Sequence, residues 1–284
     1  MTTLITTDWL ADHLSGADPS DANLVVLDAS AHLPDAQRDA RAEYAAAHIP
    51  GARFMDLKGI SPTPEAPLGS DAHRDLFAQA MGALGVSEAT PVVFYDDSKL
   101  RSAARAWLIA RLYGMQRIIV LDGGLAKWRA EGRPLDSETP AITPTSFTAT
   151  TGAGAVRTKA DMLANLDSRA EQVVDARDAA RFAGEAQDFR PGVAAGHIPG
   201  TKNLPFGELL NEDGTFKSPD AIKSAFEAAG VDLARPITTS CGSGVTASVL
   251  LFGLDLIGQS DNALYDGSWS EWGADPATPK ATGR

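Results

Sequence analysis

Short apolar runs alternate along the chain with longer segments of helical periodicity. In the second half, residues 171–174 and 236–240 form apolar or β-branched runs, and residues 222–229 have the spacing of a helix. The first half repeats this alternation, with an apolar run at 92–95 and a helical segment at 102–113. Strands that alternate with helices favour a mainly parallel sheet flanked by helices. The pattern therefore predicts an α/β fold in each half.

Three sequence features recur in the same order in the two halves, 144 to 149 residues apart. They are the His-Ile-Pro-Gly sequences at 48–51 and 197–200, the apolar runs that end near Asp28 and Asp175, and the Asp-Gly-x4-Trp sequences at 122–128 and 266–272. Each half is long enough to bury a core of its own, so the repeat indicates duplication of a domain and not a solenoid.

We therefore predict two tandem domains of one fold, at 1–137 and 158–284. Residues 138–157 are rich in Thr, Pro, Ser, Gly and Ala and have little apolar periodicity, which predicts a linker.

Polar residues of the repeat are expected to support turns. Asp28 and Asp175 each follow an apolar strand, and we expect their carboxylates to bind backbone amides of the next loop. His48 and His197 precede Ile-Pro-Gly without a cluster of other ligands, so we expect them to fix a turn and not to bind a metal.

Charge and composition narrow the function classes. The 25 Lys and Arg against 37 Asp and Glu give a net charge of −12, which disfavours binding to nucleic acid or to an anionic membrane surface. Apolar stretches such as 247–254 are too short to span a bilayer, and residues 1–10 lack the features of a signal peptide. We expect a soluble, cytoplasmic protein.

Cys241 is the single cysteine, which excludes an internal disulfide and a cysteine-rich metal site. It directly follows the 236–240 strand. Gly242 and Gly244 allow the backbone to turn its amides inward, and a predicted helix begins after them. Amides and a helix N-terminus together favour an anion, here a nucleophilic thiolate. A tyrosine-phosphatase loop needs an arginine six residues after its cysteine to bind phosphate, and Ala247 stands there instead. The sequence therefore disfavours phosphatase activity.

The paired domains, the repeated motifs and above all the sequence Cys-Gly-Ser-Gly-Val-Thr at 241–246 resemble the rhodanese superfamily, and within it the members that prefer 3-mercaptopyruvate. Thiosulfate-preferring members carry Cys-Arg-Lys-Gly-Val-Thr instead. The resemblance implies two rhodanese-like domains, of which only the second is catalytic. The first-half counterpart at 95–98 indeed lacks a cysteine.

The resemblance also implies site residues and partners. Cys241 is expected to carry a persulfide, with no other cofactor and no metal, and to pass the sulfur from a small-molecule donor to thioredoxin, a small thiol or cyanide. Arg181 and Arg190 match two family arginines that bind the substrate carboxylate and carbonyl. The expected substrate-binding residues are Arg181, Arg190, Gly242, Ser243, Gly244, Val245, Thr246 and Arg101.

The sequence departs from the family pattern in two regions, one in the segment 54–65 and one in the first-half loop at 99–105. Ser243 matches a serine that acts with an Asp and a His in some members, but Lys58 and Glu65 stand where these are expected, so we interpret Ser243 as a hydroxyl donor. We place His73 on an exposed helix face. Arg101 replaces an expected aromatic residue, and it adds positive potential near Cys241 or is a solvated loop cation.

Three alternatives remain open. The first is a thiosulfate sulfurtransferase, the second is a non-catalytic rhodanese-like binding module, and the third is a thiol redox sensor that forms an intermolecular disulfide.

Overall fold

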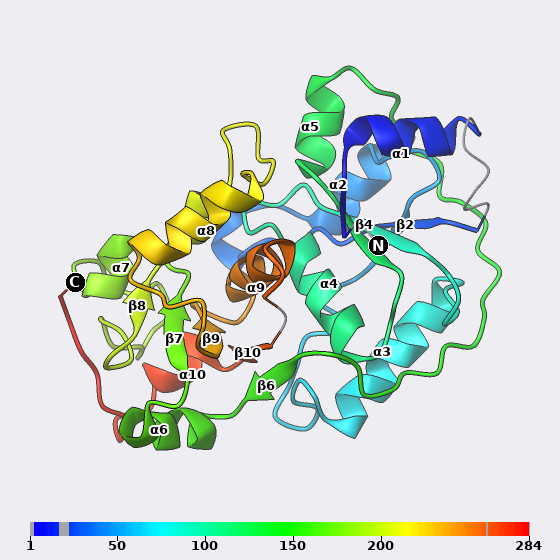
Figure 1. Cartoon of the computed structure of the whole chain (residues 1–284). Helices are drawn as coiled ribbons and strands as arrows, with labels where there is room; N and C mark the ends of the chain where they lie inside the picture. Colours follow the sequence, from blue (N-terminus) through cyan, green and yellow to red (C-terminus); the bar gives the residue numbers. More distant parts are fainter. Residues whose placement is uncertain (1–2, 17–22, 260, 284) are drawn as a thin grey trace. The chain divides into compact units, whose positions relative to one another are not determined.

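The computed structural model describes residues 3–16, 23–259 and 261–283. None of the helices in these ranges is long and apolar enough to cross a membrane. The chain forms two compact units (Figure 1). They consist of Met1–Ala153 with Glu212–Thr215, and of Gly154–Asn211 with Phe216–Arg284.

The first unit alternates strands and helices. Its strands are β1 (Leu4–Ile5), β2 (Val25–Asp28), β3 (Arg53–Phe54), β4 (Val92–Tyr95) and β5 (Ile118–Leu121). Its helices are α1 (Thr7–Leu14), α2 (Ala40–Ala46), α3 (Asp71–Ala83), α4 (Ala103–Leu112) and α5 (Gly124–Ala130), with a 3-10 turn, η2, at Pro34–Ala36.

The second unit follows the same alternation. Its strands are β6 (Ala155–Arg157), β7 (Gln172–Asp175), β8 (Lys202–Asn203), β9 (Ile237–Ser240) and β10 (Asn262–Tyr265). Its helices are α6 (Lys159–Ser168), α7 (Ala179–Ala183), α8 (Pro219–Ala228), α9 (Ala247–Leu256) and α10 (Ser268–Trp272), with a 3-10 turn, η3, at Phe206–Leu209.

The two sheets have one topology. The first has the strand order β1-β5-β4-β2-β3 and the second β6-β10-β9-β7-β8, and every strand pair described is parallel. Each strand of one sheet therefore has a counterpart in the other, with β7 matching β2 and β9 matching β4. This confirms the predicted duplication of a parallel α/β fold.

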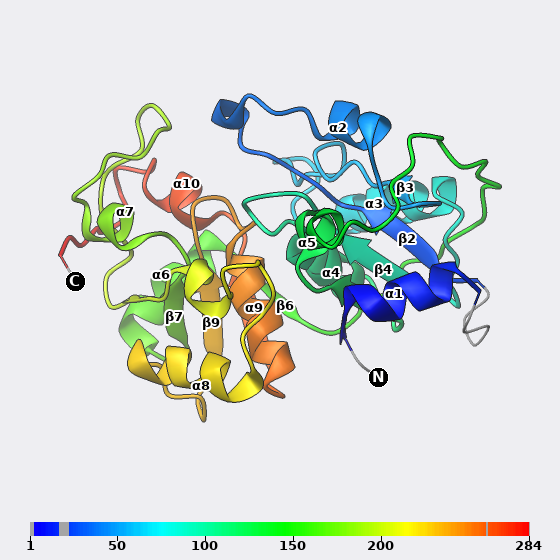
Figure 2. The same cartoon turned by 90° about the horizontal axis from the view of Figure 1, so that it is seen from above.

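Helices cover both faces of each sheet (Figure 2). In the second unit, an apolar cluster places α6 and α10 on one face, and α8 and α9 lie on the other. The cluster comprises Met162, Val173, Ile198, Tyr265, Trp269 and Trp272. In the first unit, α1 and α5 share a cluster with the strands, while α4 packs on the opposite face.

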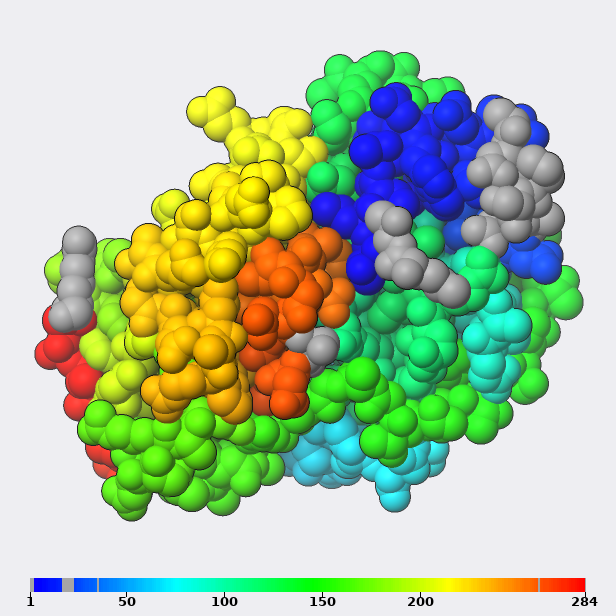
Figure 3. All heavy atoms as spheres, in the orientation of Figure 1, coloured from blue at the N-terminus to red at the C-terminus, as the bar shows by residue number. Residues whose placement is uncertain are grey.

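Helix α8 shows why these segments are helical. Ser218 caps its first turn by accepting a hydrogen bond from the Ala221 amide, and Pro219 occupies the first helical position, where no amide hydrogen is needed. Ile222 and Phe226, four residues apart, are buried. The polar side of α8 lies at the surface, in gold in Figure 3.

The residues of the predicted linker divide between the two units, with 138–153 in the first, where the Thr145 amide donates to the Gly82 carbonyl at 2.9 Å. The last three linker residues form β6, which pairs with β10 and adds an edge strand to the second sheet. Thr158 then starts α6 with a reciprocal cap: its hydroxyl accepts from the Asp161 amide at 3.2 Å, and the Asp161 carboxylate accepts from the Thr158 amide at 2.8 Å.

The repeated aspartates anchor the loops that follow β2 and β7. The Asp28 carboxylate accepts a hydrogen bond from the Ser30 amide, and that of Asp175 accepts one from the Arg177 amide, both at 2.9 Å. This confirms the expected side-chain to backbone bonds.

The repeated histidines hold turns. Nδ1 of His48 donates to the Tyr44 carbonyl at 2.7 Å, and Nδ1 of His197 donates to the Phe182 carbonyl at 2.8 Å. Each imidazole also stacks on the ring of that same aromatic residue. These contacts agree with a structural role at both turns.

The predicted exposed position of His73 is wrong. The side chain is fully buried, because α3 turns positions 73, 77 and 81 toward the core. Nε2 of His73 donates to the Ile60 carbonyl at 2.9 Å, so Nδ1 accepts from the hydroxyl of Tyr113 at 2.6 Å.

Candidate active site

The sheet topology of the second unit brings two loops together at its centre. From β7 the chain moves outward to β8, whereas from β9 it moves in the opposite direction to β10. The neighbouring carboxyl ends of β7 and β9 are therefore a topological switch point, where parallel sheets bind ligands. Cys241 directly follows β9, and Arg181 and Arg190 follow β7.

Cys241 lies at the inner end of its loop and is almost fully buried, with 1% of its surface exposed. Helix α10 holds the loop from outside: the amides of Trp269 and Ser270 donate to the carbonyls of Cys241 and Gly242 at 3.0 and 2.9 Å. Ser268 contributes its hydroxyl, which accepts from the amides of Cys241 and Gly244 at 3.1 and 3.2 Å.

The remaining loop amides are the groups that can bind an anion. Within the described residues, the amides of Gly242, Ser243, Val245 and Thr246 have no hydrogen-bond partner in the protein. The Gly244 amide, one of the expected substrate-binding groups, instead donates to the Ser268 hydroxyl. Four of the five expected amides thus stay free for sulfur or substrate.

Arg190 lies against the cysteine loop. A Cβ atom on Gly242 would lie only 3.2 Å from Nη2 of Arg190, so the guanidinium packs directly on the glycine backbone. Nη1 of Arg190 donates to both carboxylate oxygens of Asp188, at 3.0 and 3.2 Å, and the guanidinium stacks on the Phe189 ring at 4.3 Å. The structure therefore places a fixed cation next to the residue that follows Cys241.

Arg181 lies in α7 and is held there by Asp178. Asp178 caps α7 by accepting a hydrogen bond from the Arg181 amide at 2.9 Å, and it also binds Nε of the Arg181 side chain. Burial alone raises the pKa of Asp178, but these hydrogen bonds and the arginine charge outweigh it and hold the pKa below its ordinary value. The contact leaves the two terminal nitrogens of Arg181 for other partners.

Three residues that support the site were not among those predicted from the sequence: Asp188, Ser268 and Arg177. Asp188 stands two residues before Arg190, and this spacing is the one local signal that could have pointed to it. Arg177 forms a buried ion pair with Asp175 at 2.7 Å, donates to the Gly196 carbonyl at 2.9 Å and stacks on the Trp269 ring at 4.7 Å. It ties β7 to the helix that holds the Cys241 carbonyl.

The first unit shows what the equivalent loop does without a cysteine. Because Asp28 pairs with Tyr95 as Asp175 pairs with Ser240, Asp96 occupies the position of Cys241. Its carboxylate accepts hydrogen bonds from the loop amide of Ser98 at 2.8 Å and from the helix amide of Ala103 at 2.9 Å. The carboxylate of Asp96 thus binds amides that an external anion would otherwise bind.

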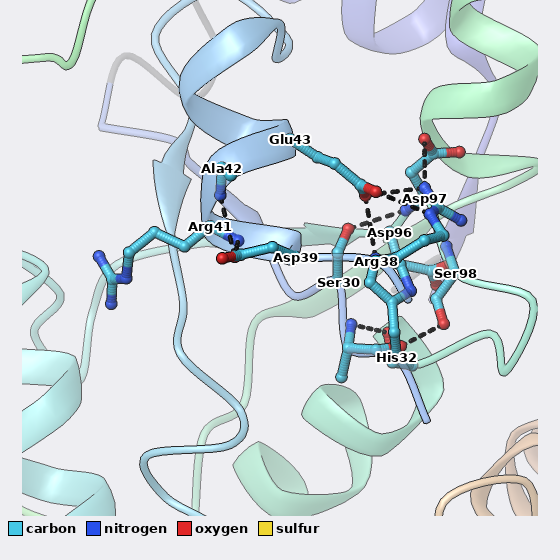
Figure 4. Close-up of polar contacts among 12 residues, drawn as sticks. Ser30, His32, Arg38, Asp39, Arg41, Ala42, Glu43, Asp96, Asp97 and Ser98 are labelled. Atoms are coloured by element: carbon cyan, nitrogen blue, oxygen red, sulfur yellow. Dashed lines mark hydrogen bonds and ion pairs between the residues drawn. The ribbon is translucent and has the colours of Figure 1, made fainter. Parts of the chain in front are cut away.

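Around this loop, Figure 4 shows a cluster of charged side chains. Arg38, from the segment after β2, contacts Asp97 at 3.2 Å and Glu43 at 2.8 Å. Burial raises the pKa of Asp96 to about 6, although the amides of Ala103 and Ser98 favour its charge. In this unit an arginine therefore faces a carboxylate on the second loop residue.

Two other predicted residues lie in different surroundings. Ser243 is exposed on the cysteine loop, and Lys58 and Glu65 are exposed in the first unit. Arg101 ends the loop after β4 with a left-handed backbone at φ +54°, and its amide donates to the Ser98 carbonyl at 3.1 Å. Its role toward Cys241 stays a prediction.

Known proteins resemble the chain over nearly its whole length. It is 43% identical over 271 residues to a 3-mercaptopyruvate sulfurtransferase of Mus musculus, covering 95% of this chain and 91% of the relative. It is 40% identical over 275 residues to a thiosulfate sulfurtransferase of Cricetulus griseus, with the same two coverages. A crystal structure of a 3-mercaptopyruvate sulfotransferase from Escherichia coli matches with a TM-score of 0.81 at 36% identity, covering 95% of this chain and 100% of the other.

The family comparison agrees with the duplicated topology. Two stretches, residues 6–131 and 158–275, each match the family model described as Rhodanese-like domain. With one parallel sheet in each stretch and a cysteine loop at the switch point of the second, the chain belongs to the rhodanese family as a tandem pair of rhodanese domains.

Proposed function

We propose that this protein is a 3-mercaptopyruvate sulfurtransferase with Cys241 as its nucleophile. The Cys241 thiolate attacks the sulfur of 3-mercaptopyruvate, so that an S–S bond forms and the C–S bond breaks. The electron pair of that bond passes to the carbon skeleton as pyruvate enolate. The proton of the substrate thiol ends on this carbon, leaving pyruvate and a Cys241 persulfide.

A second nucleophile completes the reaction. A thiolate of thioredoxin or of a small thiol, or cyanide, attacks the outer sulfur of the persulfide and releases the Cys241 thiolate. The donor is a small anionic molecule, which suits a buried cysteine in a loop at the switch point of a parallel sheet.

The observation that carries the proposal is the position of Arg190 against Gly242. The substrate carries its carboxylate and ketone on the carbon chain beyond the sulfur, so a cation beside the loop, and not within it, meets the charge. A guanidinium binds a carboxylate bidentately, and Asp188 and Phe189 fix its orientation. The first unit supports this role, because there Arg38 meets the carboxylate of Asp97 on the equivalent loop residue.

The free loop amides supply the second element of catalysis. Those of Gly242, Ser243, Val245 and Thr246 stabilise the negative sulfur of the thiolate and of the persulfide, together with the N-terminus of α9. We assign Arg181 to the substrate carbonyl, where positive charge stabilises the developing enolate. Ser243 donates its hydroxyl to the substrate.

Thiosulfate is the rival donor, and relatives of similar identity carry either name. Thiosulfate is a compact dianion that suits cationic side chains inside the loop, whereas this loop is neutral from Gly242 to Thr246. We expect kcat/KM for sulfur transfer to cyanide to be at least about tenfold higher with 3-mercaptopyruvate, about 1.4 kcal/mol in the transition state. Steady-state rates with both donors test this, and a preference for thiosulfate would contradict it.

Arg190→Ala tests the carboxylate contact. We expect kcat/KM for 3-mercaptopyruvate to fall on the order of 100-fold, about 2.7 kcal/mol, mainly through KM, because a charge-assisted contact is lost. Arg235→Ala is the matched control, since this exposed arginine lies before β9, makes a hydrogen bond to the Arg169 carbonyl and changes the net charge equally. An equal loss in both variants would remove Arg190 from the site.

A further inference from the structure

Ser268 has a backbone conformation that favours glycine. Its φ is +50°, in the left-handed region, and its side chain is fully buried. At the equivalent position of the first unit, the third residue of the Asp-Gly-x4-Trp motif, Gly124 has φ +58°. A side chain in this region strains the backbone, and such strain persists where the side chain has a role. The unit with the cysteine thus carries a strained serine where the other has glycine.

The hydroxyl of Ser268 binds two amides of the cysteine loop, three residues apart. It accepts hydrogen bonds from the Cys241 amide at 3.1 Å and the Gly244 amide at 3.2 Å, and it donates to the Tyr265 carbonyl at 2.8 Å. Its donor capacity and both lone pairs are thereby used. One buried oxygen therefore fixes the loop to the end of β10.

The first unit fixes its loop in a different way. There the Asp96 carboxylate binds the amides of Ser98 and Ala103 from inside the loop. A side chain at Gly124 has no room, because its Cβ would lie 2.3 Å from the Asp96 carbonyl oxygen. In the first unit a carboxylate of the loop itself, that of Asp96, holds the loop. In the second unit the hydroxyl of Ser268, a residue outside the loop, holds the loop of Cys241 and leaves its other amides free for the sulfur.

We propose that Ser268 is a positioning residue, which holds the Cys241 loop in the conformation that directs its free amides at the sulfur and so sets the rate of persulfide formation. This inference rests on the proposed function. It adds a residue that touches neither substrate nor sulfur and acts through the amides of Cys241 and Gly244.

Ser268→Gly and Ser268→Ala together separate this role from a merely structural one. Both remove the hydroxyl, but glycine also relieves the backbone strain at φ +50°, so the glycine variant keeps its melting temperature. We expect kcat for pyruvate release from 3-mercaptopyruvate to fall about tenfold in both variants, while KM stays within about twofold because Arg190 and Asp188 are untouched.

A second readout does not depend on the sulfur donor. The rate of Cys241 alkylation by iodoacetamide, followed against pH, reports the thiolate, and we expect its midpoint to move to higher pH in both variants because the loop amides are less well directed. Ser224→Ala is the matched control, since this α8 hydroxyl also donates to a backbone carbonyl, that of Asp220. It leaves kcat and the alkylation profile unchanged.

The outcomes are distinct. The inference is overturned if both variants have the kcat and the alkylation profile of the unchanged protein. It is also overturned if kcat falls in Ser268→Ala but not in Ser268→Gly, because the backbone strain and not the hydroxyl then sets the rate. If the unchanged protein transfers sulfur from neither donor, the proposed function fails. The alkylation profile then decides the role of Ser268 alone.

Discussion

Cys241→Ser eliminates sulfur transfer with either donor. The serine hydroxyl is a far weaker nucleophile toward sulfur than a thiolate, and it cannot hold a persulfide, so we expect the rate to fall by at least about 10³-fold. Cyanide and thiol acceptors should be affected equally, since both act on the same covalent intermediate. Steady-state pyruvate release and intact-protein mass after incubation with 3-mercaptopyruvate measure the effect.

Only the protein with Cys241 should gain the mass of one sulfur atom and release one equivalent of pyruvate when no acceptor is present. Because the side chain is buried and serine is nearly isosteric, the circular dichroism spectrum and melting temperature of Cys241→Ser serve as the control for folding. Substantial transfer by this variant would refute covalent catalysis by Cys241, and it would favour a site elsewhere in the chain.

The arrangement of the fold could be predicted from local patterns. The runs at 92–95 and 236–240 form β4 and β9, the central strands of the two parallel sheets, because each run is short, apolar or β-branched and followed by a helical segment. The repeated sequence features also predicted that the two domains share one fold, and the two sheets do have the same topology. The position of His73 was mispredicted because its helix face is defined by Phe77 and Met81, and a polar residue on that face gave no signal of burial.

The residues that support the site were harder to find. The contact between Arg190 and Gly242 joins two loops far apart in the sequence, and it was expected only through the family resemblance. Asp188, Ser268 and Arg177 act on other side chains or on backbone amides, and such roles depend on tertiary packing that no short motif encodes. The left-handed backbone conformation of Ser268 can be recognised only from its φ angle in the structure.

The buried ion pair of Arg177 and Asp175 is the most sensitive point for stability. Both side chains are almost fully buried, at 2% and 3% exposed, and Nε and Nη2 of Arg177 bind the two carboxylate oxygens. In Arg177→Ala the Asp175 carboxylate stays buried without its cation, and the Gly196 carbonyl and the Trp269 ring lose a partner. We expect the free energy of unfolding of the second unit to fall by about 3–5 kcal/mol.

Urea unfolding followed by tryptophan fluorescence measures this loss, fitted with a separate transition for each unit where the curve requires one. Replacing both partners, as Asp175→Asn with Arg177→Met, should recover much of the loss, because no uncompensated charge then remains buried. Lys223→Ala is the surface control: its pair with Glu227 is long, at 3.9 Å, and more than half exposed on both sides, so we expect less than about 0.5 kcal/mol. A loss of similar size in Arg177→Ala and Lys223→Ala would mean that the buried pair of Arg177 and Asp175 does not stabilise the second unit more than a surface pair does.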